Sequence, residues 1–188
     1  KGKKILIYFF LFILAGSINN LSLSNIKFDK IKSIEVSGLN TTENLKVKKK
    51  IEDLSLKNIF FIDQSSINQT MNSNNLIEKY SVFKKYPSSI DIKITMTDFL
   101  AKINIDDKIF LVGSNGKFSD KSFINKELPF IFGKPQIEEF LNNKKILDNS
   151  KFKYKDIKNF YFYPSKRWDL ALKNNIILKL PQKNIQKS

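Results

Sequence analysis

The chain contains no cysteine and no histidine among its 188 residues. Their absence removes thiolate and imidazole metal sites, cysteine nucleophiles, the Ser-His-Asp triad and histidine general bases. No disulfide framework can form. The protein therefore does not require an oxidising compartment, and the cysteine content indicates nothing further about where it is located. We therefore predict no metal site and no cofactor.

Catalytic motifs are also scarce. The six glycines form no phosphate-binding loop. Ser-x-x-Lys motifs arise by chance in a lysine-rich chain, and the partner motifs of penicillin-binding enzymes are missing. These motifs are Ser24/Lys27, Ser81/Lys84, Ser114/Lys117 and Ser150/Lys153. The carboxylate pairs Asp106-Asp107 and Glu138-Glu139 are sequence neighbours whose side chains point apart, as in a turn and a helix start. We predict no catalytic residue and no enzymatic activity.

Arginine is nearly absent from a strongly basic chain. The net charge is +15, yet Arg167 is the only arginine among 33 basic residues. Arginine makes the commonest base-specific contact and is the side chain best suited to bidentate hydrogen bonding with phosphate. The lysines are spread through a chain rich in Asn, Ile and Phe rather than gathered in a patch. The aromatic run Phe160–Tyr163 and Trp168 suit half-buried strands better than base-stacking platforms. Nucleic-acid binding is disfavoured.

The N-terminus is the only stretch apolar enough to meet a membrane. Lysines at positions 1, 3 and 4 precede an uncharged apolar run of about 14 residues, short of the ~20 that span a bilayer. Extension to Leu23 reaches a spanning length. Either a retained signal-anchor helix or a secretory signal peptide cut after Ala15–Ser17 fits this pattern. In both cases the lysines stay cytoplasmic and residues after about Asn25 are exported. The expected anchor residues are Ile5, Leu6, Ile7, Phe9, Phe10, Leu11, Phe12, Ile13 and Leu14.

A first module is expected over residues 30–100, after a tail and anchor over residues 1–25. Residues 31–36 alternate as a strand that stops at Gly38. A helix follows, with Thr41 or Thr42 as N-cap and Leu45, Val47, Ile51 and Leu54 on its apolar face. A second helix is predicted from Ser66 and Gln69, at capping-box spacing, with its apolar face continuing from Ile67 through Met71 and Leu76 to Tyr80. A strand then ends at Tyr86-Pro87, and Ile90, Ile92, Ile94 and Met96 form the buried side of the next. The predicted order is β-α-α-β-β.

A second, mostly antiparallel module with one helix is expected over residues 101–188. Asn115-Gly116 is a hairpin signal between two alternating runs. Residues 128–135 suggest a strand, and residues 136–147 suggest a helix with Ile137, Phe140 and Leu141 on its apolar side. Three short strands close the chain, the last two joined at Asn174-Asn175. The fold class is therefore α+β.

Taken in this order, the motifs resemble the FtsQ/DivIB family of bacterial cell-division proteins, whose POTRA domain precedes a β-domain. The matching positions are Val36, Gly38, Tyr86, Pro87, Ile90, Ile92, Ile94, Ala101, Gly116, Phe118, Trp168, Leu170, Leu172, Asn174, Leu180 and Pro181. The chain departs from the family pattern in two ways: Tyr86 stands where Trp is usual, and Met96 and Phe99 replace a frequent Glu and Pro.

The resemblance implies a non-enzymatic, membrane-anchored scaffold at the division septum of the cell inner membrane, with its domains in the periplasm. Implied partners are FtsB, FtsL and, through them, the septal peptidoglycan synthase. The family's β-domain normally continues beyond this signature, and its closing strands dock FtsB by strand addition. We therefore expect the sequence to be truncated at its C-terminus and, because it begins with Lys and not Met, at its N-terminus as well. The last strand would then be an exposed, candidate partner-binding edge, formed by Ile176, Ile177, Leu178 and Leu180. The alternative is a POTRA-containing component of an outer-membrane protein export system with a cleaved signal peptide.

Overall fold

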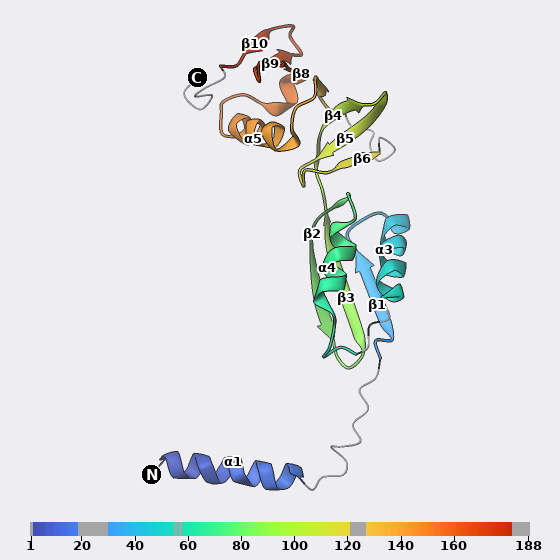
Figure 1. The fold of residues 1–188 in the computed structure, drawn as a ribbon, viewed down its shortest axis with the longest axis vertical. Helices are drawn as coiled ribbons and strands as arrows, with labels where there is room; N and C mark the ends of the chain where they lie inside the picture. Colours follow the sequence, from blue (N-terminus) through green and yellow to red (C-terminus); the bar gives the residue numbers. More distant parts are fainter. Residues whose placement is uncertain (1, 19–29, 55, 57, 121–126, 182–188) are drawn as a thin grey trace.

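The computed structural model describes the chain except residues 1, 19–29, 55, 57, 121–126 and 182–188. The apolar N-terminal run forms helix α1, Gly2–Ile18, and is followed by two separate β-sheets (Figure 1). Within the described residues, no helix is both long and apolar enough to cross a membrane. The expected extension of the anchor to Leu23 lies outside the described residues.

The first sheet has three strands in the order β1-β3-β2 and carries two helices. Their bounds are β1 Ser33–Ser37, α3 Thr41–Asp53, α4 Gln64–Asn72, β2 Ile77–Lys85 and β3 Ser89–Met96. The parallel pairing of β1 with β3 and the antiparallel pairing of β2 with β3 place β3 in the centre. The predicted β-α-α-β-β order is confirmed.

The core of this sheet lies between the helices and one face of the strands. Val47 and Ile51 of α3 and Ile67 and Met71 of α4 are buried against isoleucines of β1 and β3. Their periodicity predicted this burial, because side chains three or four residues apart share one helix face. Two predicted core positions are wrong, since Leu45 is 61% exposed and Met96 is 36% exposed.

Both helices of this sheet begin earlier than predicted. Asn40, not Thr41 or Thr42, is the N-cap of α3, and its Oδ1 accepts the backbone N–H of Glu43 at 2.8 Å. Asp63 is the N-cap of α4, so Ser66 lies within the helix rather than at its start. Asn and Asp are as good at this position as Ser, because a short side-chain oxygen reaches the free N–H groups of the first turn.

Helix α4 also ends earlier than predicted, so Ile77 and Tyr80 belong to β2 instead. The run Asn72–Asn75 stops the helix, because asparagine and serine side chains compete for backbone groups. The Asn74 side chain accepts the N–H of Leu76 at 2.9 Å, which turns the chain into the strand.

The second sheet has seven strands in the order β10-β9-β8-β7-β4-β5-β6. Strand β7 pairs in parallel with β4 and with β8, and the other neighbours are antiparallel, as expected. Its elements are β4 Phe99–Ile105, β5 Lys108–Gly113, β6 Phe118–Asp120, β7 Phe130–Phe132, α5 Ile137–Asp148, the 3₁₀ turn η2 Tyr154–Asp156, β8 Ile157–Phe162, β9 Trp168–Leu172 and β10 Ile177–Lys179.

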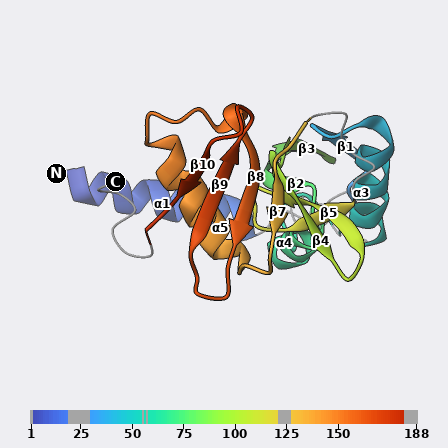
Figure 2. The same ribbon diagram turned by 90° about the horizontal axis from the view of Figure 1, so that it is seen from above.

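The core of the second sheet is aromatic. Phe140 of α5 meets Phe160 at 5.3 Å and Trp168 at 6.3 Å between ring centroids. All three are at most 4% exposed. Figure 2 shows α5 lying across one face of β8, β9 and β10. This packing fixes the position of the closing strands.

Candidate interaction surfaces

The motif residues of the first sheet lie at opposite ends of it. Val36 pairs with Ile92, and Gly38 follows at the end of β1. Gly38 has a φ of 113°, and an added Cβ would lie 1.8 Å from the Ile94 carbonyl oxygen. Only glycine fits so close a backbone approach. Tyr86 and Pro87 form the turn between β2 and β3 at the other end, where Tyr86 is 63% exposed.

The motif residues of the second sheet include a packed pair. Trp168 is buried in the aromatic core, and its carbonyl oxygen accepts the Leu180 N–H at 2.9 Å. Pro181 is exposed just beyond β10. Gly116 lies in the β5–β6 turn with a φ of 75°. The structure therefore brings Trp168 and Leu180 together, whereas Gly116 lies in a separate turn.

The predicted edge strand is the last strand of the described sheet. Among the described strands, β10 pairs only with β9, through the register Leu178↔Leu170. Ile176 and Ile177 are 50% and 59% exposed. The backbone bonds from Leu172 N to Ile176 O and from Leu180 N to Trp168 O show that the even-numbered residues face β9. Because direction alternates along an antiparallel strand, the N–H and C=O of residues 177 and 179 point away from β9.

The two sheets meet at a polar junction that the sequence did not predict. The β5–β6 turn reaches the start of β2: the Asn115 amide donates to the carbonyls of Asn75 at 3.0 Å and Ile77 at 2.9 Å. Thr97 and Ser114 both donate to the Glu78 carboxylate, at 3.1 Å and 2.8 Å. The turn thus closes on the end of the first sheet.

Apolar contacts accompany these hydrogen bonds. Leu76 of the loop before β2, Phe99 of β4 and Leu111 of β5 form a separate buried cluster. The Lys117 ammonium group also donates to the Asn72 carbonyl at 2.6 Å. No motif marks such a junction, because its hydrogen-bonded partners are 19 to 45 residues apart and each is an ordinary turn or strand residue. We call this set of contacts the junction.

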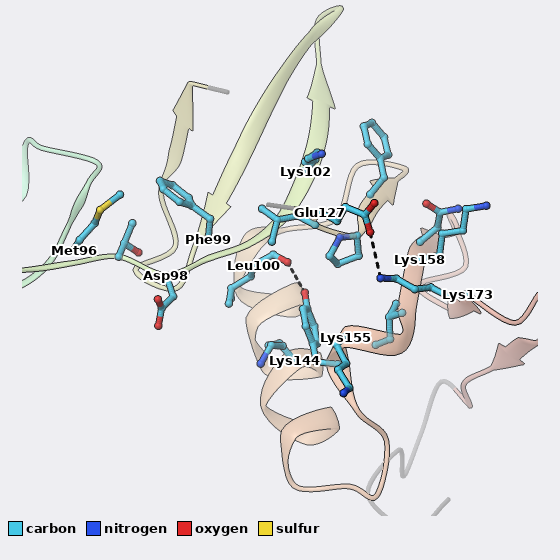
Figure 3. A pocket seen from close by; sticks show the side chains of 17 residues that line it. Met96, Asp98, Phe99, Leu100, Lys102, Glu127, Lys144, Lys155, Lys158 and Lys173 are labelled. Carbon is cyan, nitrogen blue, oxygen red and sulfur yellow. Dashed lines mark hydrogen bonds and ion pairs between the residues drawn. The ribbon is translucent and has the colours of Figure 1, made fainter. Parts of the chain in front are cut away.

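A cavity of about 1140 Å³ opens beside the second sheet, between the start of β4, β7, α5 and η2 (Figure 3). Five lysines line it: Lys102, Lys144, Lys155, Lys158 and Lys173. Two of their charges are paired, Lys173 with Glu127 at 3.5 Å and Lys144 with Asp148 at 2.5 Å. The Tyr154 hydroxyl donates to the Leu100 carbonyl at 2.7 Å, which ties η2 to β4.

Tyr154 acts in this cavity as a neutral donor. Burial, with a smaller contribution from the nearby Asp148 charge, raises the pKa of its phenol well above the usual range. The Lys144 ammonium group lies 4.4 Å from the centre of the same ring, a cation–π contact. These contacts hold α5, η2 and β4 together, and their groups are engaged in structural bonds rather than arranged for proton transfer.

The Ser-x-x-Lys motifs described by the structure do not form serine–lysine pairs. Ser114 Oγ bonds Glu78, and Lys117 reaches Asn72 instead. Ser150 Oγ donates to the Leu147 carbonyl. The Ser24/Lys27 motif lies outside the described residues. Asp106 and Asp107 form the β4–β5 turn with φ of 49° and 61°, and both glutamates at 138 and 139 lie in the first turn of α5.

A second feature that the sequence did not predict is a group of exposed rings. Phe60 and Phe61, which lie in the short apolar stretch between α3 and α4, are 51% and 70% exposed beside the Tyr86 turn. Two consecutive phenylalanines after a helix were the only sequence feature that could have indicated exposed rings, and the same feature is equally compatible with a buried apolar segment.

Comparison with known proteins identifies the first sheet and its helices. Residues 29–95 match the family model described as "POTRA domain, FtsQ-type". The first sheet with α3 and α4 is therefore a POTRA domain of the FtsQ type. The similarity extends beyond it: the chain is 21% identical over 165 residues to a cell division protein FtsQ of Rickettsia typhi, covering 84% of this chain and 59% of that protein.

A cell division protein FtsQ of Rickettsia bellii is likewise 21% identical over 167 residues, covering 85% of this chain and 60% of that protein. The similarity to FtsQ proteins therefore extends over most of the chain, beyond the matched POTRA domain. The chain spans about three fifths of the length of these relatives. A solved structure of the major extracytoplasmic domain of DivIB from Geobacillus stearothermophilus, in its trans isomer, aligns with a TM-score of 0.36 and 9% identity, covering 48% of this chain and 83% of that one.

Proposed function

We propose that this protein is a non-enzymatic scaffold of the bacterial divisome, linking early and late division proteins at the septum. The observation that supports it best is the FtsQ-type POTRA domain followed by a sheet whose last described strand pairs on one side only, in a chain similar to FtsQ over 84% of its length. An open edge binds a partner by main-chain pairing and requires no catalytic group.

The proposed organisation is a short tail and anchor over residues 1–25, a POTRA domain over 30–100 and a β-domain over 101–188. The anchor would be held by the cell inner membrane, with both domains in the periplasm. The apolar character of residues 5–18 and the lysines before them support this orientation. An anchor raises the local concentration of the domains at the membrane and so favours weak contacts with membrane partners.

The membrane placement is tested by fractionating cells that express the full-length gene. We expect the protein in the membrane fraction with its N-terminus intact and resistant to alkaline extraction. Recovery of a soluble form that begins near Ser17 would instead indicate a cleaved signal peptide and would favour the export alternative.

The division role is tested by an N-terminal fluorescent fusion of the full-length gene combined with depletion. We expect a band at midcell and elongated cells after depletion. A diffuse envelope signal with cells of normal length would refute a divisome role.

The partner-binding role of β10 is tested at Ile177, whose N–H points to the open edge. Ile177→Pro removes that donor, whereas the matched variant Ile177→Ala removes most of the side chain but keeps the N–H. We expect FtsB and FtsL to co-purify with the Ala variant and to be lost from the Pro variant. Equal recovery with both variants would show that β10 does not bind these partners by strand pairing.

A further inference from the structure

Three aromatic side chains project from one end of the POTRA domain. Phe60, Phe61 and Tyr86 are 51%, 70% and 63% exposed, and the Phe60 and Tyr86 ring centroids lie 5.4 Å apart. We call these three residues the aromatic tip. Large rings exposed together leave apolar area in water, which marks a contact surface more often than scattered single residues do.

The local structure holds these rings outward. The Asn58 Oδ1 accepts the backbone N–H groups of Phe60 at 3.0 Å and Phe61 at 3.1 Å, which fixes the turn that carries them. Ile59, immediately before the two phenylalanines, is 1% exposed and anchors the turn in the POTRA core. Asp63 then starts α4 as its N-cap. The exposed rings therefore belong to an ordered turn with a buried anchor.

The aromatic tip lies at the end where the chain enters from its N-terminal segment. Strand β1 begins at Ser33, which pairs with Ser89 just after the turn that carries Tyr86. The Lys32 N–H bonds the Ser88 carbonyl at 2.8 Å, so the incoming chain passes beside this turn. Figure 1 shows β1 beginning at this end of the three-stranded sheet. The twelve steps from Ile18 to Lys30 reach at most about 40 Å.

Rings at this end match the chemistry of a membrane interface. Tyr86 suits the headgroup level of a bilayer, where its ring finds an apolar and a polar side, and Phe60 and Phe61 add apolar area that suits the acyl boundary just beneath. Exposed Lys30 and Lys84 lie two residues before Lys32 and Tyr86 in the sequence and suit lipid phosphates. Lys85 bonds Glu35 and lies near Asp91, and these partners raise its pKa and keep its charge.

We propose that the aromatic tip rests in the headgroup region of the bilayer that holds the N-terminal segment, so that the POTRA domain stands on the membrane. This inference rests on the membrane placement proposed above. The far end of the domain, where α3 begins at Thr41, would be lifted by the length of β3, about 26 Å for its 8 residues.

The test uses single-cysteine labelling, because the chain has no cysteine of its own. The full chain, reconstituted in vesicles of phosphatidylethanolamine and phosphatidylglycerol, carries an environment-sensitive dye at Phe61→Cys or, as the matched control, at exposed Thr42→Cys. We expect blue-shifted emission, quenched by lipids brominated near the headgroup, only for the label at 61. Adding Phe60→Ser and Tyr86→Ser to the labelled chain should abolish this shift, while far-ultraviolet circular dichroism, which reports the helices and strands of the POTRA domain, stays unchanged.

Each other outcome overturns the inference. If the chain co-floats with vesicles but both labels report water, or both report lipid equally, the tip is not the membrane-facing end. If the label at 61 stays in lipid despite the two serine substitutions, the dye inserts by itself and the rings contribute nothing. If the chain does not co-float with vesicles at all, the proposed membrane placement has failed, and the inference fails with it.

Discussion

The junction between the two sheets makes one quantitative prediction, for Asn115→Ala. The substitution removes two donated bonds, to the carbonyls of Asn75 and Ile77, and the bond that Asn115 Oδ1 accepts from the Lys117 N–H at 3.0 Å. A hydrogen bond contributes about 1 kcal/mol net, and water replaces part of that at the exposed Asn75 carbonyl. We expect a loss of about 2 kcal/mol in the free energy of unfolding, from the same principle.

Urea unfolding of the full chain in mild detergent measures this loss with two probes. Trp168, the only tryptophan, reports the second sheet alone, whereas far-ultraviolet circular dichroism reports both sheets. We expect the two transitions to coincide in the unaltered protein and to separate in Asn115→Ala. The matched control is Asn174→Ala in the β9–β10 turn, whose side chain accepts only the Ile176 N–H at 3.3 Å. Equal losses below about 0.5 kcal/mol for both variants would refute a joining role for the junction.

Two further predictions concern the POTRA domain. Gly38→Ala should cost at least about 2 kcal/mol of unfolding free energy, because the added methyl group meets the Ile94 carbonyl. The control Gly116→Ala, where φ is also positive but the nearest neighbour lies at 3.5 Å, should cost about 1 kcal/mol. Equal melting temperatures for the two variants would contradict the close approach at Gly38. Hydrogen bonds donated chiefly by Ser66 lower the pKa of Asp63 from 3.8 to about 2. Because the folded pKa lies below the unfolded one, this stabilisation is present above about pH 4 and is lost as the pH falls toward 2. Asp63→Asn keeps a capping oxygen without the charge. Its free energy of unfolding relative to that of the unaltered protein should therefore rise as the pH falls from about 4 toward 2. A difference that does not depend on pH would contradict the lowered pKa.

The sequence allowed the central strand of the POTRA domain to be predicted because that strand is half buried. Ile90, Ile92 and Ile94 are at most 6% exposed, while Lys93 on the opposite face is exposed. The alternation of apolar and polar residues can therefore be recognised in the sequence. Strand β2 was harder to predict, since it lies at the sheet edge and only Ile77 is buried along it. Because the burial pattern of β2 is weak, its first residues were assigned to the preceding helix α4.

The two hairpin turns could be predicted because their residue types favour a particular backbone conformation. Asn115-Gly116 and Asn174-Asn175 predicted hairpins that the structure confirms, because Gly116 and Asn175 adopt the positive φ that such turns require. The junction could not be predicted. Asn115 was recognised as a turn residue, but its amide contacts a loop forty residues earlier, and no local preference encodes such a contact.

The route of the backbone through the POTRA domain also determines how it carries tension. The chain enters at the start of β1 and leaves at the end of β3, which continues into β4 after only two residues. Strands β1 and β3 are parallel and paired over five positions, from Ser33↔Ser89 to Ser37↔Lys93. A pull between the N-terminal segment and the second sheet therefore slides the two strands lengthwise past each other. All the hydrogen bonds of the pair then share the load at once, whereas a pull across the sheet would open them one at a time.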